Sequence, residues 1–219
     1  MSFLSHSWDM SLQDARRLQM KLAAHIIREN RLETVKTVAG IDVGLKGDMA
    51  CAAIVVLNFP KLDVVDQFTA TRRITCPYIP GLLSFREGPV ILDALDQLDR
   101  KPDLLIFDGQ GIAHPYRLGI ASHIGLLSDY PSIGCAKSRL CGQYQEPDAE
   151  RGSHVSLMDH GETIGAIVRT RTGVKPVFVS IGHRVDLKTS IDVVLGCCKA
   201  YRLPETTRKA HRLASDVLS

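Results

Sequence analysis

Two aspartates lie within apolar stretches of the sequence, where an acidic side chain is unusual. Asp42 lies inside the apolar segment TVAGIDVG (37–44), and Asp108 ends the apolar run DLLIFD (103–108). A carboxylate among apolar neighbours is costly unless it binds a cation or accepts several hydrogen bonds. Each also has an ordinary alternative: Asp42 could face the solvated side of a strand, and Asp-Gly is a common turn after one.

The two aspartates mean more together than apart. If segments 37–44 and 103–108 form neighbouring strands, their carboxylates meet at one end of a sheet, where open α/β sheets place their ligand sites. Like charges that close repel, unless a divalent cation neutralises them. Mg²⁺ is bound by one or two carboxylates together with phosphate oxygens and water. The pair therefore predicts metal-assisted hydrolysis of a phosphodiester.

Glu87 is a third candidate carboxylate. Ser84-x-x-Glu87 matches a capping box, which would make its role structural. Pro89 argues against a helix begun at Ser84, because the proline would stand where that helix needs an N–H. We therefore expect a helix that starts near Gly88 with Pro89 at its first position, which leaves Glu87 free.

The stretch CPYIPGLLSFREGP (76–89) contains the segment Pro77-Tyr78-Ile79-Pro80. A PxxP segment can be a polyproline ligand, or a rigid wedge on whose tyrosine a base stacks. It can also be a buried turn, which is what the residues alone favour.

His211 lies among Arg208, Lys209 and Arg212 in the last predicted helix. A histidine on a basic helix face is usually solvated, and this is the reading its neighbours favour. It could instead shuttle a proton or hold a metal-bound water molecule.

Several nucleotide and hydrolase motifs are absent. Residues 109–114 read GQGIAH, which nearly matches the dinucleotide loop GxGxxG, but His114 occupies its last position and no acidic residue ends the following strand. No Walker A, GxSxG or HExxH sequence occurs. GIDVG is similar to the phosphate loop of actin-like ATPases, whose two lobes need more than 219 residues.

The hydrophobic pattern predicts helices and strands that alternate after three initial strands. We expect a helix over 11–30, strands over 37–44, 49–58 and 61–75 with a hairpin turn at Gly47-Asp48, a helix over 88–100, a strand over 103–108, a helix near 115–128, a strand near 132–136, a mobile polar loop over 142–161, strands over 163–170 and 176–181, a helix from 187 through Tyr201, and a last helix after Pro204. This order predicts an α/β, ribonuclease-H-like mixed sheet with helices on both faces.

Composition supports one globular domain over residues 1–219, since 45% of the residues are hydrophobic and no linker or repeat occurs. The six cysteines lack zinc-site spacing, and the N-terminus lacks a signal-peptide pattern, so we expect a cytoplasmic protein with reduced thiols. No apolar run is long enough to span a bilayer, so we expect no membrane partner. A net charge of +3 permits a polyanionic partner without requiring one.

Taken together, these segments resemble the endonuclease V family, which acts at deaminated bases. The resemblance covers most of the chain and is carried by GIDVG, PYIPGLLSFRE, PDLLIFDGQGIAHPYRLGIASHIG, IGCAKSRLCG, IGHRVDL and YRLPETTRKAH. It implies roles for residues that match family positions: metal ligation by Asp42, Asp108 and Glu87, a helper role near the metal for His211, a basic group beside the cleaved strand in Lys137, a wedge at Pro77-Tyr78-Ile79-Pro80, and a pocket for the extruded base at Gly109, Gly111 and His114.

The resemblance also implies the reaction. Family members cut the second phosphodiester on the 3′ side of deoxyinosine, leaving 3′-hydroxyl and 5′-phosphate ends. The implied cofactor is Mg²⁺, for which Mn²⁺ substitutes, and the implied partner is damaged DNA bound by a monomer. Inosine-containing RNA is the alternative substrate, and a non-catalytic lesion-binding module is the alternative class. Gln110 departs from the histidine common in bacterial relatives, and His211 falls where some relatives carry aspartate.

Overall fold

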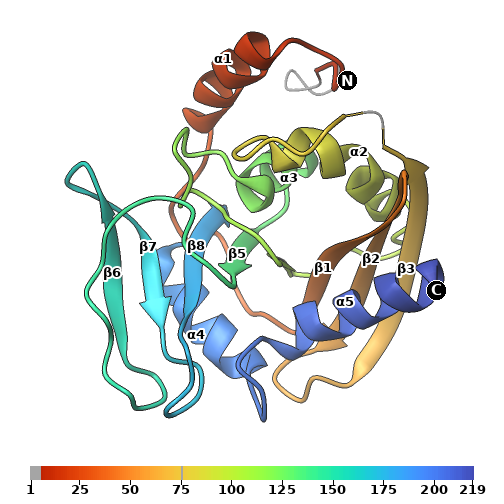
Figure 1. Cartoon of the computed structure of the whole chain (residues 1–219). Coiled ribbons are helices and arrows are strands. Elements are labelled where there is room, and N and C mark those ends of the chain that lie inside the picture. The colour runs from red at the N-terminus through yellow and green to blue at the C-terminus, as the bar shows by residue number, and fades with distance from the viewer. Residues whose placement is uncertain (1–5, 75) are drawn as a thin grey trace.

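An eight-stranded mixed sheet forms the centre of the molecule in this computed structural model, which describes residues 6–74 and 76–219 (Figure 1). The strand order is β3-β2-β1-β4-β5-β8-β7-β6. The strands are β1 Thr37–Lys46, β2 Met49–Asn58, β3 Val64–Arg73, β4 Leu104–Phe107, β5 Ser132–Ala136, β6 His154–Asp159, β7 Glu162–Val168 and β8 Val177–His183. The helices are α1 Leu12–Ala23, α2 Leu83–Leu95, α3 Ile120–Ser128, α4 Leu187–Cys197 and α5 Glu205–Leu218.

The strands β1 and β4 lie side by side and parallel, which confirms the pairing on which the two-aspartate prediction depends. Their register places Ile41 opposite Phe107. β1 also pairs with β2 through the predicted hairpin, in which Gly47 adopts a left-handed φ of +60°. All four residues of β4 are buried, as expected for a central strand covered on both faces.

Alternating side chains of the central strands point into two apolar layers. Leu104 and Ile106 join one core with residues of α4 and α5, whereas Leu105 and Phe107 join another with residues of α2 and α3. Helices therefore cover both faces of the sheet, and the fold is the predicted α/β, ribonuclease-H-like one. α5 crosses the front of β1–β3 in Figure 1. It can lie so close because Gly40 has no side chain: a Cβ there would meet the Thr206 backbone at 2.1 Å.

The predicted start of the second helix is wrong. α2 begins at Leu83 with Leu82 as its N-cap, so Pro89 lies inside the helix and Glu87 belongs to it. Ser84 is not a capping residue either, because its hydroxyl bonds to His123 Nδ1 at 2.9 Å. Tertiary packing outweighs the proline: the residues around it, among them Phe85 and Val90, are buried against the sheet and α1.

Other predicted boundaries also need correction. α1 has the predicted Ser11 cap but ends at Ala23, because the chain then leaves the helix to bond with residues 183 and 184. The loop predicted over 142–161 contains β6, an edge strand so polar that only Leu157 is buried. The third helix starts at Ile120 rather than near 115, and α4 ends at Cys197, which leaves Tyr201 outside it and exposed. Thr75, at the end of the predicted third strand, lies outside the described residues.

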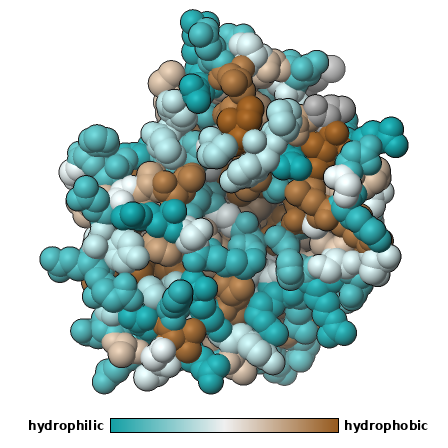
Figure 2. Space-filling model, in the orientation of Figure 1, coloured by the Kyte–Doolittle hydropathy of each residue, from teal (hydrophilic) through white to brown (hydrophobic). Residues whose placement is uncertain are grey.

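The surface is mostly hydrophilic on the face shown in Figure 2, where apolar side chains gather in separate patches. Within residues 6–74 and 76–219, no helix is both long enough and apolar enough to cross a bilayer.

Candidate active site

Asp42 and Asp108 lie at the same end of two adjacent parallel strands. The backbone N–H of Asp108 donates to the carbonyl of Ile41 at 3.1 Å, which fixes the two aspartates next to each other. By strand alternation both side chains belong to the sheet face that α5 covers. Each is only 12% exposed, so the surroundings give these carboxylates little water.

Glu87 approaches the same place from α2, on the other side of the sheet. Burial, together with the negative charges of Asp42 and Asp108, raises the pKa of Glu87 to about 8. Burial, and then the charge of Asp108, raise the pKa of Asp42. The structure thus brings together the three carboxylates that the sequence singled out, and their mutual repulsion favours a cation among them.

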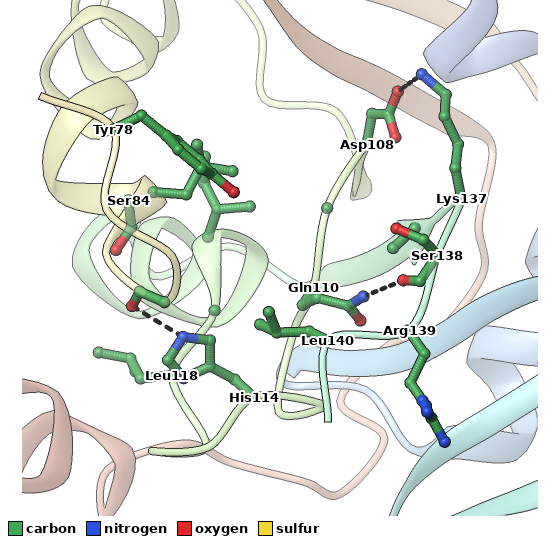
Figure 3. Close-up of a pocket in the computed structure, with 16 residues that line it drawn as sticks. Tyr78, Ser84, Asp108, Gln110, His114, Leu118, Lys137, Ser138, Arg139 and Leu140 are labelled. Atoms are coloured by element: carbon green, nitrogen blue, oxygen red, sulfur yellow. Dashed lines mark hydrogen bonds and ion pairs between the residues drawn. The ribbon is translucent and has the colours of Figure 1, made fainter. Parts of the chain in front are cut away.

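A basic side chain contacts each aspartate. His211, on α5, donates its Nδ1–H to Asp42 Oδ2 at 2.7 Å, so it does not merely face solvent as its basic neighbours suggested. The Lys137 ammonium, just beyond β5, lies 2.5 Å from Asp108 Oδ2 (Figure 3). Lys137 is 46% exposed, so it can also reach an anion bound outside the site.

The donor set fits a hard cation that shares its ligands with the substrate. Among the described residues, no three histidine, cysteine or acidic side chains form a compact metal cluster. Mg²⁺ needs fewer, since it keeps several waters and commonly takes one or two carboxylates plus phosphate oxygens. Asp42 and Asp108 are the pair that would hold the ion, with Glu87 as the third oxygen donor nearby.

A cavity of about 270 Å³ opens beside Asp108 and Lys137 (Figure 3). Gly109 and His114 line it, as the resemblance implies, and so does Tyr78 from the opposite wall. Gly111 does not line it. That glycine is packed behind the cavity, where a Cβ would lie 1.9 Å from the carbonyl oxygen of Ile181.

His114 forms part of the cavity wall with both ring nitrogens occupied. The N–H of Tyr116 donates to its Nδ1 at 3.1 Å, so the proton resides on Nε2, which donates to the carbonyl of Gly81 at 2.9 Å. Burial lowers the pKa of His114 to about 4, which keeps the ring neutral at physiological pH. His114 is therefore suited to holding the cavity in shape.

The wedge segment projects at the mouth of this cavity. Tyr78 is 60% exposed, Pro77 and Pro80 are exposed as well, and only Ile79 packs inward, against Leu82 and its neighbours. The buried turn that the residues alone favoured is therefore wrong for three of the four. The Arg86 guanidinium lies 6.0 Å from the Tyr78 ring centroid.

The sequence did not reveal two amides that brace the cavity. Gln19 of α1 is fully buried, and its Nε2 donates to the carbonyls of Gly81 at 2.8 Å and Leu118 at 3.2 Å. Gln110 Nε2 donates to the carbonyl of Ser138 at 2.8 Å across the cavity (Figure 3). The available signal for Gln19 was its place four residues after Ala15, on the apolar face of its helix.

Comparisons with known proteins identify the family of this chain. The model of the family Endonuclease V matches residues 20–212. The Endonuclease V of Roseiflexus sp. (strain RS-1) is 55% identical over 95% of this chain and 94% of its own length. The crystal structure of Endonuclease V from Streptomyces avermitilis is 42% identical with a TM-score of 0.91, covering 97% of this chain and 95% of that one.

A second solved relative carries nucleic acid. Ciona intestinalis Endonuclease V is 28% identical, with a TM-score of 0.83 over 96% of this chain and 98% of that one. It was crystallised with a 24mer DNA containing an inosine followed by a ribo-adenosine. The matched family model and the identity to these relatives over nearly the whole length establish that this chain belongs to the endonuclease V family.

Proposed function

We propose that the protein is a Mg²⁺-dependent endonuclease that cuts one DNA strand near a deaminated base, deoxyinosine above all. The observation that carries the proposal is the placement of Asp42 and Asp108 side by side at the end of β1 and β4, next to the base-sized cavity. A protein that only bound DNA would gain nothing from three carboxylates close to phosphates. This argues for the enzyme over a lesion-binding module.

The carboxylates and the residues around them have different roles in the proposed hydrolysis. A divalent ion bound by Asp42 and Asp108 would activate water and stabilise the leaving oxygen. His211 orients the Asp42 carboxylate through its hydrogen bond, and Lys137 presents a positive charge to the phosphate. Water adds to phosphorus as the P–O3′ bond breaks, so one product ends in a 3′-hydroxyl and the other in a 5′-phosphate.

Base recognition follows from the wedge and the cavity. Hypoxanthine pairs weakly, so turning it out of a duplex costs less than turning out an ordinary base. Tyr78 would replace it in the stack, and the base would enter the cavity between Gly109 and His114. The position of the cut, at the second phosphodiester 3′ to the lesion, is taken from the resemblance to the family.

A second candidate substrate is inosine-containing RNA. The DNA in the Ciona intestinalis complex has a ribo-adenosine after its inosine, so a ribose is accepted in that relative beside the lesion. The same carboxylates would serve both substrates, because the chemistry at phosphorus is the same.

Strand cutting tests the proposal directly. End-labelled duplexes with and without a single deoxyinosine would be incubated in Mg²⁺, Mn²⁺ or EDTA, alongside the inosine RNA. We expect a metal-dependent nick at the second bond 3′ of deoxyinosine, with an upstream fragment that a DNA polymerase can extend. If only the RNA is cut, the substrate is inosine-containing RNA and not DNA. Binding without any cutting would refute the catalytic assignment.

A further inference from the structure

The wedge segment forms part of the walls of two cavities. Tyr78 and Gly81 line the base cavity, whereas Pro77 and Ile79 line a wider groove of about 780 Å³. The groove extends between the N-terminal segment around Trp8, the ends of β2 and β3, and the start of α2. The wedge thus separates the base cavity from the groove.

If the wedge enters the duplex between its two strands at the lesion, one strand passes on each side of it. Asp108 and Lys137 line the base cavity and not the groove, so the strand to be cut lies on the cavity side. We propose that the groove holds the undamaged strand of the duplex, at the nucleotide opposite the lesion. This inference rests on the proposed function and adds a second nucleic-acid subsite to it.

The charge of the groove suits a phosphate backbone. Three arginines line it, Arg72, Arg73 and Arg86, and Asp9 is the single carboxylate among its described lining residues. Such a stripe of guanidinium groups is the electrostatic footprint of a bound nucleic-acid strand.

Two of these arginines are paired in a way that a phosphate can replace. Arg72 contacts Asp93 and Arg73 contacts Asp48, each at 2.9 Å, and all four side chains are at least 45% exposed. Exposed ion pairs contribute little to stability, whereas a guanidinium holds a phosphate with two parallel hydrogen bonds. The arginines can therefore exchange their carboxylates for the strand.

The third arginine has no such partner. Arg86 forms no ion pair or hydrogen bond with the residues that the structure describes, and its Nε is buried without an acceptor. Its guanidinium lies near the Tyr78 ring, directly beside the wedge. This cation, whose charge also acts on the Glu87 carboxylate, is placed to meet the phosphate nearest the separated base pair.

Comparing single-stranded with duplex DNA tests the inference. The probe is one labelled strand with a single deoxyinosine, alone or annealed to its complement, and its binding is followed by fluorescence anisotropy in EDTA at several salt concentrations. For the variant Arg72→Gln/Arg73→Gln we expect roughly tenfold weaker binding of the duplex. The plot of log affinity against log salt should become shallower by about 1 to 2. Binding of the single strand should stay at the wild-type value.

The matched control is Arg28→Gln/Arg31→Gln, which also removes two half-exposed arginines, each paired with one glutamate. These residues lie between α1 and β1, away from the groove, and should leave both affinities unchanged. Equal losses for single strand and duplex, or no loss for either, would overturn the inference. A wild-type protein that binds both DNAs but cuts neither in Mg²⁺ would refute the proposed function, and the two affinities would still decide whether the groove takes a second strand.

Discussion

Asp108 has two charged neighbours of opposite sign. Lys137 lies 2.5 Å from its carboxylate, and Asp42 is close enough that its charge and that of Asp108 oppose each other. Removing either aspartate therefore relieves repulsion while it takes away an oxygen donor. Binding of the lesion and cutting of the strand should respond differently to the same substitution.

We expect Asp42→Asn and Asp108→Asn to cut deoxyinosine DNA about 10³-fold more slowly or worse, because a bound metal supplies several kcal/mol of transition-state stabilisation. Lesion affinity should be kept, since neither residue belongs to the wedge and asparagine keeps the shape of the Asp108 side chain in the cavity wall. Single-turnover cutting and anisotropy measure the two quantities. Asp192→Asn, an exposed aspartate on α4, is the control. Full cutting by either active-site variant would refute the metal assignment.

Gln19 is another residue whose substitution separates recognition from chemistry. In Gln19→Met the carbonyls of Gly81 and Leu118 lose a donor, so the cavity wall should loosen next to the wedge. We expect the ratio of kcat/KM for deoxyinosine over undamaged DNA to fall roughly tenfold, the worth of one or two buried hydrogen bonds.

A purely structural role for Gln19 would lower the melting temperature without changing that ratio. Gln13→Met is the matched control, because Gln13 lies on the exposed face of the same helix. If both variants keep the wild-type ratio at a temperature where they are folded, the brace has no part in recognition.

At the scale of elements, α2 carries Glu87 and follows the wedge closely in the chain, and its contact with the N-terminal segment depends on Gly88. A Cβ at this position would lie 2.6 Å from the Trp8 ring and 3.2 Å from Ile124. Alanine is better than glycine inside a helix by about 1 kcal/mol, but the clash with the half-buried Trp8 ring and the buried Ile124 should outweigh this.

We therefore expect Gly88→Ala to displace Trp8 and to lower the free energy of unfolding. Trp8 is the single tryptophan of the chain, so its emission should move to longer wavelength as the ring enters water. In Gly88→Ala/Trp8→Ala the obstacle is gone, and the alanine at 88 should become neutral or stabilising there. An unshifted emission spectrum in the single variant would contradict the prediction, because it would mean that the Trp8 ring makes room for the methyl group without becoming exposed to water.

The elements also show what the sequence could predict about the site. Apolar runs located β1 and β4, and the open-sheet rule placed Asp42 and Asp108 at one end of them, so the central pair was predictable. The start of α2 was not, because local rules weigh Pro89 more heavily than the long-range packing that surrounds it. β6 was missed because its alternation is confined to Val155 and Leu157 within a polar stretch rich in turn residues, and only Leu157 is buried. Gln19 acts through two backbone carbonyls far along the chain, which no local pattern reveals.

At the scale of the whole molecule, the two sheet faces have different tasks. Asp42 lies on the face under α5, which itself carries His211, while α2 on the other face carries Glu87 and follows the wedge in the chain. In the proposed function, nucleic acid is engaged where the faces meet, at the end of the strands. Stability of the α2–α3 layer therefore supports recognition directly, and two buried histidines make that stability depend on pH.

Burial lowers the pKa of His114 to about 4 and that of His123 to about 3. In the unfolded chain both histidines protonate near pH 6.5. Below that pH the unfolded state therefore binds protons, while both histidines of the folded state stay neutral. As the pH falls from roughly 6.5 to the folded-state pKa, each histidine should thus lower the free energy of unfolding by about 1.4 kcal/mol for every pH unit. Carboxylates with raised pKa values, such as Glu87, contribute with the opposite sign, so a difference between variants is the informative quantity.

Urea unfolding followed by Trp8 fluorescence at pH 7, 6 and 5 measures this difference. We expect His123→Gln to be less stable than wild type at pH 7, because the imidazole packs among Trp8 and Phe85 and bonds to Ser84. The gap should then narrow toward pH 5, since the variant no longer has to exclude that proton. His160→Gln is the control, because a side chain that is 93% exposed meets water in both states. A gap that stays constant over this range would show that His123 is protonated without cost in the folded protein.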